Sequence, residues 1–241
     1  MLKVHSLESL GTHEGPGIRF VIFLQGCNYR CQYCHNPDTQ SLDGGKEISE
    51  QELLKSIENS KPYYKNNGGV TFSGGEPLMQ AKALKDICQK IKDQDLNIAL
   101  DTNGSILNQE VKDLLNLIDL VLLDIKHIDP VWHQKITGQD NKAPLEFAQY
   151  LKEINKPVWL RYVLVPGYTD QPEFLEKLGM HFKDYQNILR LEILPYHTFG
   201  VYKFKELGRE YELKKVKIPT PEEVTQAKKI LDRYFKEVII R

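Results

Sequence analysis

Three cysteines lie close together near the N-terminus, and their type and spacing indicate a metal centre. Cys27, Cys31 and Cys34 are separated by three residues and then by two, in the segment CNYRCQYC that directly follows an apolar run. Thiolates select zinc, copper(I) or iron-sulfur clusters. The spacing therefore predicts a thiolate-ligated metal site within residues 27–34.

Structural zinc is one interpretation of these thiols, with His35 as the fourth ligand. Two observations count against it. His35 directly follows Cys34, which is a poor spacing for two ligands of one ion, and no second CxxC or HxxxH motif follows in the chain. The alternative is a 4Fe-4S cluster, which is normally held by four cysteines.

Cys88 is the remaining cysteine of the chain, and its position argues against a fourth ligand. Apolar residues recur around it at helical spacing, at Leu84, Ile87 and Ile91. Cys88 is therefore predicted to be a small buried hydrophobe on the apolar face of a helix. A cluster with three cysteine ligands leaves one iron with an open coordination position, as a catalytic zinc does, and this predicts a reactant bound to that iron.

The length and composition of the chain limit the number of domains and the kinds of partner that we expect. The chain has 241 residues, of which 41% are hydrophobic, so we expect a single domain over residues 1–241. Its 32 basic and 33 acidic residues leave a formal net charge of -1, which favours neither nucleic acid nor an anionic membrane. No secretion signal is recognisable, and no stretch approaches the roughly 18 apolar residues of a membrane span. We expect a cytoplasmic protein with no nucleic-acid or membrane partner.

Short apolar runs alternate with segments of helical periodicity. The predicted strands are Ile18–Phe23, Val70–Phe72, Ile98–Leu100, Leu120–Leu123, Trp159–Val165 and Ile188–Leu194. The predicted helices are Gln51–Glu58, Gln80–Lys92, Gln109–Leu117, Leu145–Ile154 and Glu173–Phe182, with a last helix after the capping box Thr220-Pro221-Glu222-Glu223. This alternation predicts an α/β fold with a parallel sheet and outer helices.

A polar or glycine-containing group follows each predicted strand. The groups are Gln25-Gly26-Cys27, Ser73-Gly74-Gly75-Glu76, Asp101-Thr102-Asn103-Gly104, Asp124-Ile125-Lys126, Pro166-Gly167 and Pro195-Tyr196-His197. Parallel strands bring these groups to one face, which suits a barrel-like site better than a crevice at one switch point. Since the six strands are fewer than the eight of a closed barrel, we predict a partial (β/α)6 barrel with an open side.

These motifs together resemble a known family. CxxxCxxC followed by His35-Asn36 is similar to the signature of radical S-adenosylmethionine (SAM) enzymes. The segments Glu14–Phe20, Ser73–Glu76, Asp101–Gly104, Asp124–Lys126, Arg161-Tyr162 and Leu194–His197 resemble, in order and spacing, the glycyl-radical activases that act on pyruvate formate-lyase. The resemblance covers nearly the whole chain.

The resemblance implies an oxidoreductase with a 4Fe-4S cluster and SAM as cofactors. In that family the open iron chelates the methionine part of SAM, and one electron from the cluster produces a 5'-deoxyadenosyl radical. The radical then removes hydrogen from one glycine of the partner, here the glycine-bearing loop of pyruvate formate-lyase, under the anaerobic conditions of glucose metabolism. It further implies reduced flavodoxin as the electron donor and a monomeric activase.

The resemblance also assigns roles to residues. Cys27, Cys31 and Cys34 match the cluster ligands, and Arg161 matches an arginine near the glycine-bearing peptide. The positions that match contacts to SAM are Tyr33, Cys34, His35, Gly75, Asp101, Asp124, Ile125, Lys126 and His197. The positions that match the ligands of a monovalent cation, Na⁺ or K⁺, are Asp101, Thr102, Asp124 and the backbone carbonyl of Leu122.

Two alternatives stay open at this point. The partner could be another glycyl-radical enzyme, although many activases of that kind carry a cysteine-rich insert that this chain lacks after Cys34. A protein of another class, a non-catalytic metal-binding interaction module, could also carry three thiols. Such a module would not need the polar groups that follow the predicted strands.

Overall fold

The protein is described by a computed structural model that covers residues 1–65 and 67–241. The chain divides into two compact units, Met1–Asn28 with Thr39–Leu122, and Tyr29–Asp38 with Leu123–Arg241. The cysteine motif is divided between them, because Cys27 belongs to the first unit and Cys31 and Cys34 belong to the second. The single domain expected over residues 1–241 stays a prediction.

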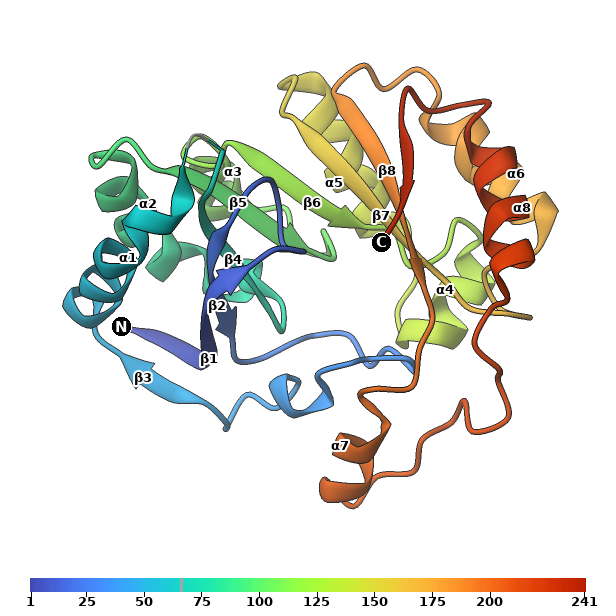
Figure 1. The fold of residues 1–241 in the computed structure, drawn as a ribbon, viewed down its shortest axis with the longest axis horizontal. Helices are drawn as coiled ribbons and strands as arrows, with labels where there is room; N and C mark the ends of the chain where they lie inside the picture. The colour runs from blue at the N-terminus through green and yellow to red at the C-terminus, as the bar shows by residue number, and fades with distance from the viewer. Residues whose placement is uncertain (66) are drawn as a thin grey trace. The chain divides into compact units, whose positions relative to one another are not determined.

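The sheet is open and mostly parallel, with strand order β3-β1-β2-β4-β5-β6-β7-β8-β9 (Figure 1). Parallel pairs include β2 with β4, β4 with β5, β7 with β8 and β8 with β9, whereas β1 is antiparallel to both β2 and β3. The strands are β1 Leu2–Gly11, β2 Arg19–Leu24, β3 Lys46–Ile48, β4 Gly69–Gly74, β5 Asn97–Thr102, β6 Leu120–Asp124, β7 Val158–Leu164, β8 Ile188–Pro195 and β9 Val238–Ile240.

The first unit buries β2 and β4 almost completely, as expected for parallel strands covered on both faces. Its helices are α1 Glu50–Tyr64, α2 Ala81–Lys92 and α3 Gln109–Leu115, with short 3-10 turns η1 Pro37–Thr39, assigned to both units, and η2 Pro77–Gln80. Ser49 and Asn108 cap α1 and α3 by accepting backbone N–H groups. The apolar face of α2, including Cys88, is buried.

The second unit contains α4 Pro130–Thr137, α5 Lys142–Glu153, α6 Pro172–Phe182, α7 Val201–Glu206 and α8 Pro221–Leu231. Asp129 caps α4, and Gly138 ends it with a left-handed φ of 82°. The predicted capping box of Thr220 and Glu223 is present at the start of α8. In Figure 1, α7 stands apart from β7 and β8 of its own unit, close to residues 29–38, with which it forms hydrogen bonds.

The predicted α/β class is confirmed, and each of the six predicted strands and six predicted helices corresponds to an observed element. Among the described residues, five strands and α-helices were not predicted, namely β1, β3, β9, α4 and α7, and neither were the 3-10 turns η1 and η2. β3 and β9 have three residues each, too few to show an alternating pattern. β1 alternates only at Leu2 and Val4, and its register with β2 is broken by irregularities. Among the described residues, no helix has the length and apolar character to cross a membrane.

Candidate functional site

Cys27 lies in the first unit, just beyond the end of β2. The chain leaves the strand through Gly26, whose N–H donates to Thr39 O at 2.7 Å, and the N–H of Cys27 donates to Gln40 O at 3.4 Å. The side-chain amide of Asn103, which follows the end of β5, lies 4.0 Å from the Cys27 Sγ, although β4 separates β5 from β2 in the sheet. Backbone hydrogen bonds and one polar side chain thus hold this thiol.

The loop that contains Gly75 packs directly against Gly26, the first residue of the cysteine loop (residues 26–38). A Cβ on Gly75 would lie 2.1 Å from Gly26 O, which no side chain tolerates. The N–H of Gly75 donates to Leu24 O at 2.9 Å, and the N–H of Glu76 donates to Gly26 O at 2.8 Å. The close backbone approach expected of this glycine is therefore made to the segment that leads into Cys27.

Glu76 is completely buried, although no role for it was predicted from the sequence. Its carboxylate accepts the Thr102 hydroxyl at 2.6 Å, the Asn103 N–H at 2.8 Å and the Leu78 N–H at 3.0 Å. Burial raises the pKa of Glu76 to about 7, against the opposing effect of these donors. Glu76 is the last residue of the strand-end motif Ser73–Glu76 and bonds to the second motif, Asp101–Gly104. Its membership of a strand-end motif is the sequence signal that could have identified it.

Three of the four predicted cation ligands belong to the first unit and one belongs to the second. Asp101 and Thr102 end β5, and Leu122 is a buried residue of β6. The carboxylate of Asp101 accepts the Ser73 hydroxyl at 2.7 Å. Asp124, in the second unit, forms an ion pair with Lys126 at 2.8 Å.

Cys31 and Cys34 are held by the backbone of the second unit. The N–H groups of Arg30 and Gln32 donate to Thr137 O and Ile136 O, each at 2.9 Å, and so fasten the loop to the end of α4. The N–H of Cys34 donates to Cys31 O at 3.1 Å, which closes a tight turn between the two cysteines. Cys31 is buried and Cys34 is partly exposed.

Tyr33, which lies within this turn, is buried close to Lys126. The hydroxyl of Tyr33 is buried and has no hydrogen-bond partner among the described residues, and burial raises its pKa well above the usual range. The Lys126 Nζ lies 6.0 Å from the Tyr33 ring centroid. Burial by itself would lower the pKa of Lys126, but the charges of Asp124, Tyr33 and Cys31 outweigh it and raise the pKa.

His35 and His197 stack on one another, with ring centroids 3.9 Å apart and an interplanar angle of 29°. Desolvation of the ring, followed by the neighbouring His197, lowers the pKa of His35. Partial burial also lowers the pKa of His197. Both rings are therefore neutral at pH 7, which leaves nitrogen acceptors as well as donors at this edge of the cysteine loop.

Arg161 and Ile125 are joined by a backbone hydrogen bond, in which the N–H of Ile125 donates to Arg161 O at 3.1 Å. The side chain of Arg161 pairs with the fully buried Glu192 at 3.1 Å. The same carboxylate also pairs with Arg190 at 2.6 Å and Arg241 at 3.3 Å. Glu192 thus fixes the guanidinium of Arg161 within the second unit.

The segment around α7, residues 196–216, packs against the cysteine loop and is called the α7 segment below. Tyr196, Phe204, Tyr211 and Leu213 form a buried cluster with Tyr33, and Cys34 packs against that cluster. The hydroxyl groups of Tyr196 and Tyr211 are hydrogen-bonded to each other at 2.7 Å. Cys34 therefore borders a mainly apolar surface, in which the Tyr196 and Tyr211 hydroxyl groups are paired and the Tyr33 hydroxyl has no partner among the described residues.

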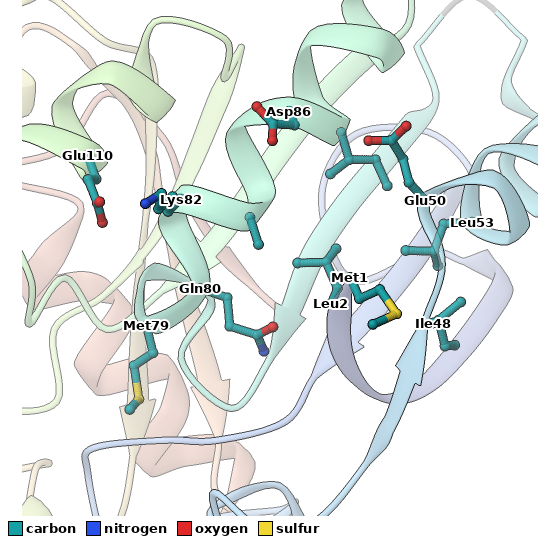
Figure 2. Close-up of a pocket in the computed structure, with 12 residues that line it drawn as sticks. Met1, Leu2, Ile48, Glu50, Leu53, Met79, Gln80, Lys82, Asp86 and Glu110 are labelled. Atoms are coloured by element: carbon teal, nitrogen blue, oxygen red, sulfur yellow. The ribbon is translucent and has the colours of Figure 1, made fainter.

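A pocket of about 460 Å³ opens elsewhere in the first unit, between the start of β1, α1 and α2 (Figure 2). Apolar residues such as Leu2, Ile48 and Leu53 line it together with the charged Glu50 and Asp86. None of the site residues predicted from the sequence lines this pocket. This pocket is therefore separate from the candidate site around the cysteine motif.

The donor set of the motif suits an iron-sulfur cluster. Its cysteines form no disulfide, and Cys88 is fully buried in α2, where burial raises the pKa of its thiol. Cys88 is thereby confirmed as a packed side chain in an apolar helix face. Within residues 1–65 and 67–241, no three His, Cys, Asp or Glu side chains are grouped as ligands of a single metal ion. Three thiols, with a buried Tyr33 hydroxyl that has no partner among the described residues, fit a cluster together with an organic ligand better than an isolated ion.

Comparison with known families identifies the fold. The model of the radical SAM superfamily matches residues 21–178, which include the cysteine motif and strand ends β2 to β7. The chain belongs to the radical SAM superfamily. Membership of this superfamily implies a 4Fe-4S cluster and SAM as cofactors, and thiolates are the ligands that such clusters use.

Relatives within the radical SAM superfamily narrow the assignment. The chain is 46% identical over 95% of its length to the pyruvate formate-lyase-activating enzyme of Streptococcus mutans, covering 90% of that protein. It is 41% identical to the pyruvate formate-lyase 1-activating enzyme of Escherichia coli K12, with 98% of each chain covered. The chain therefore belongs to the family of pyruvate formate-lyase-activating enzymes.

Solved structures of radical SAM proteins share this fold. A crystallised domain of a pyruvate-formate lyase-activating enzyme from Bacteroides vulgatus superimposes with a TM-score of 0.60 at 25% identity, covering 71% of this chain and 98% of that one. A radical SAM methyltransferase from Sphaerobacter thermophilus reaches a TM-score of 0.68 at 13% identity, over 92% of this chain and 66% of that one. The latter likeness concerns the fold alone.

Proposed function

We propose that this chain activates pyruvate formate-lyase under anaerobic conditions by generating a glycyl radical on it. The observation that carries the proposal is identity of 41–46% with pyruvate formate-lyase-activating enzymes over at least 94% of the chain. No cysteine-rich insert interrupts this alignment in the chain, because Cys88 is its last cysteine. That absence favours pyruvate formate-lyase over other glycyl-radical partners.

Cys27, Cys31 and Cys34 are proposed as the ligands of the cluster, in the manner that the resemblance implies. When bound, the cluster supplies the electron that cleaves SAM to the radical that abstracts hydrogen from the partner's glycine. The residues of the chain bind and orient the reactants and exclude water. The apolar cluster beside Cys34 serves that exclusion, since water and small reductants must be kept from the radical.

Contacts to SAM are proposed for the residues that match the family's positions. Tyr33 offers a buried hydroxyl that lacks a partner among the described residues, and the neutral His35 and His197 offer ring nitrogens. Lys126 stays protonated because its ion pair with Asp124 stabilises the charged ammonium group and raises the pKa of the lysine. The further proposed contacts are Cys34, Gly75, Asp101, Asp124 and Ile125.

A monovalent cation is proposed at Asp101, Thr102, Asp124 and the carbonyl of Leu122, as the resemblance implies. Hard oxygen donors of this kind suit Na⁺ or K⁺ better than they suit a soft metal. Arg161 is proposed to contact the glycine-bearing peptide. Its Nε is fixed by Glu192, which would orient the planar guanidinium toward peptide carbonyl groups.

Reduced flavodoxin is proposed as the electron donor, and the chain is proposed to act as a cytoplasmic monomer. A low-potential donor is needed because cleavage of a sulfonium demands a cluster near the low end of the range of about -700 to +450 mV. The formal net charge of -1 is compatible with a dissolved protein that makes no use of nucleic acid or a membrane.

Electron paramagnetic resonance (EPR) of a mixture tests the proposed partner. The reconstituted, reduced protein is incubated anaerobically with SAM and pyruvate formate-lyase, and the organic-radical signal is recorded. We expect a glycyl radical signal that depends on SAM and disappears in the Cys31→Ala variant. Formation of 5'-deoxyadenosine without this signal would transfer the proposal to another glycyl-radical enzyme. Bound zinc without either product would support the interaction module instead.

A further inference from the structure

Asn103 lies in the loop that follows β5, and neither the family positions nor the comparisons assign it a role. Its side chain is 6% exposed, and its Nδ2 lies 4.0 Å from the Cys27 Sγ. We propose that Asn103 is a positioning residue that donates a hydrogen bond to the Cys27 thiolate and thereby raises the reduction potential of the cluster. The proposal rests on the proposed function only in placing the cluster on Cys27.

The orientation of the Asn103 amide follows from its other contacts. Its Oδ1 accepts the N–H of Ser105 at 2.9 Å, so the oxygen is directed into its own loop. The NH2 group must then face the cysteine loop, where it reaches Cys27 Sγ and, at 3.4 Å, the Oδ1 of Asn28. An inverted amide would set NH2 against the Ser105 N–H and its oxygen against the thiolate, and would lose both interactions.

The backbone of Asn103 is fixed independently of its side chain. Its N–H donates to the buried carboxylate of Glu76 at 2.8 Å. The hydroxyl of Thr102 donates to the same carboxylate at 2.6 Å and accepts the N–H of Gly104 at 3.0 Å. Glu76 therefore acts on Cys27 through Asn103, because it holds the residue that carries the donor.

A second contact ties the same loop to the cysteine motif. The side-chain amide of Asn28 donates to the Ser105 hydroxyl at 2.7 Å, and that hydroxyl donates to the Asn28 Oδ1 at 3.1 Å. Asn28 directly follows Cys27 in the chain. The ends of β2 and β5 are thus joined by further hydrogen bonds beside the Asn103 to Cys27 contact, which restricts the distance between donor and sulfur.

The physical effect on the cluster follows from charge. Reduction adds one negative charge to the cluster and its thiolate ligands. A fixed N–H donor stabilises that charge more in the reduced state than in the oxidised state, and hydrogen bonds to the sulfur atoms are among the factors that set cluster potentials. Loss of the donor should therefore make the cluster harder to reduce.

Potentiometric titration of the reconstituted protein, followed by EPR of the reduced cluster, tests this directly. Asn103→Leu removes the donor at similar volume, and Asn103→Asp keeps the acceptor for Ser105 but replaces the donor with a carboxylate. We expect both variants to have more negative potentials, with Asn103→Asp shifted further. At the midpoint potential of the unchanged protein, the ratio of reduced to oxidised cluster should fall about tenfold in Asn103→Asp, which corresponds to about 59 mV for a one-electron couple.

Two controls separate this effect from simpler causes. Asn108→Asp adds the same charge at an exposed helix cap that accepts the Val111 N–H, and aspartate caps helices equally well. Ser105→Ala removes the hydroxyl bound to Asn28 but leaves the Asn103 donor and the Ser105 N–H in place, so its shift should be smaller than that of Asn103→Leu. Asn108→Asp should keep the potential of the unchanged protein. Unchanged potentials in the two Asn103 variants with full iron content, or equal shifts in Asn108→Asp, would overturn the proposal.

A measurement on the unchanged protein covers the case in which Asn103 variants fail to fold. The protein is produced with asparagine labelled with ¹⁵N in the side chain, and the reduced cluster is examined by pulsed EPR. Donation to Cys27 predicts a hyperfine coupling from a side-chain nitrogen, and absence of the coupling contradicts the proposal. Failure to bind iron at all would instead contradict the placement of the cluster on Cys27, so the two failures are distinguishable.

Discussion

Cys27 and Cys34 belong to one short motif, yet the two units hold them by different means. Around Cys27 the contacts are polar, with Asn103 and the buried Glu76 connecting the ends of β2, β4 and β5. Around Cys34 the contacts are mainly aromatic and aliphatic, from Tyr33 and the α7 segment. Buried polar networks are lost when one partner is removed, whereas apolar packing is lost through cavities or clashes.

The two sides of the motif should therefore fail in different ways. Damage to the polar side should leave buried donors without acceptors and change the electrostatics of the cluster. Damage to the apolar side should loosen the cysteine loop and admit water, with a smaller direct effect on charge.

The largest effect is expected from Glu76→Ala. The substitution leaves the buried N–H groups of Leu78 and Asn103 without their acceptor, and each unsatisfied group costs about 1 to 3 kcal/mol. We therefore expect the free energy of unfolding to fall by about 2 to 4 kcal/mol in denaturant titrations. Glu76→Gln, which keeps one acceptor oxygen, should lose less.

The control for this prediction is Glu110→Ala, at an exposed position in the first turn of α3. It should change the free energy of unfolding by less than about 0.5 kcal/mol. Equal stability of Glu76→Ala and Glu110→Ala would mean that the polar network does not support the first unit.

Gly200→Ala should disrupt the apolar side by a clash. A Cβ at this buried glycine would lie 2.7 Å from both the Cα and the O of His35, and these backbone atoms cannot rotate away. The α7 segment must then separate from the cysteine loop, at a cost of about 1 to 3 kcal/mol. We expect reconstituted protein to retain less iron and to release it faster to a chelator.

Phe199→Ala is the matched control, because Phe199 is the preceding residue and is 80% exposed. Its iron retention should equal that of the unchanged protein. Full retention of iron in Gly200→Ala would show that the α7 segment does not hold the Cys34 side of the motif.

The hydroxyl pair of Tyr196 and Tyr211 should behave as a coupled unit. Tyr196→Phe or Tyr211→Phe leaves one buried hydroxyl without its partner, at a cost of about 1 to 2 kcal/mol. The double variant removes both hydroxyl groups and should be less destabilised than the sum of the single variants, by about 0.5 to 1.5 kcal/mol. Simple additivity in thermal or denaturant unfolding would contradict a direct bond between them.

The smallest effect is expected from Lys203, whose Nζ bonds to Asn36 Oδ1 at 2.9 Å and to Asp38 Oδ2 at 3.0 Å. Because this ion pair is only partly buried, Lys203→Met should lower stability by about 1 kcal/mol or less. Lys203→Arg should restore most of the loss, and the exposed Lys205→Met in the same helix should have no effect. If Lys205→Met destabilises as much as Lys203→Met, the contact to the cysteine loop is not the cause.

Much of the fold could be predicted from the sequence because the strands of a parallel sheet are short and strongly apolar. Val70–Phe72 and Leu120–Leu123 lie within β4 and β6, and the capping box at Thr220 marks the start of α8. The α7 segment could not be predicted in the same way. Its short helix is stabilised by tertiary contacts from Phe204 and Lys203, which no local pattern reveals.

The same limit applies to the candidate site. The thiols of Cys27, Cys31 and Cys34 are recognisable from spacing, and the buried position of Cys88 follows from helical periodicity. Asn103 and Glu76 act through contacts between residues distant in sequence. The strand-end motifs that contain them indicate that they lie near the site, but they do not indicate which groups they contact. The division of support between a polar and an apolar side depends on these tertiary contacts and has no local sequence pattern.

The central claim is that three cysteines hold the cluster and leave one iron open to SAM. The most direct test is the amount of 5'-deoxyadenosine formed by anaerobically reconstituted and reduced Cys88→Ala protein in the presence of SAM. Because Cys88 is a packed side chain in α2, the account predicts the same iron content and nucleoside yield as in the unchanged protein. A variant that folds and contains iron but forms no nucleoside would contradict the account.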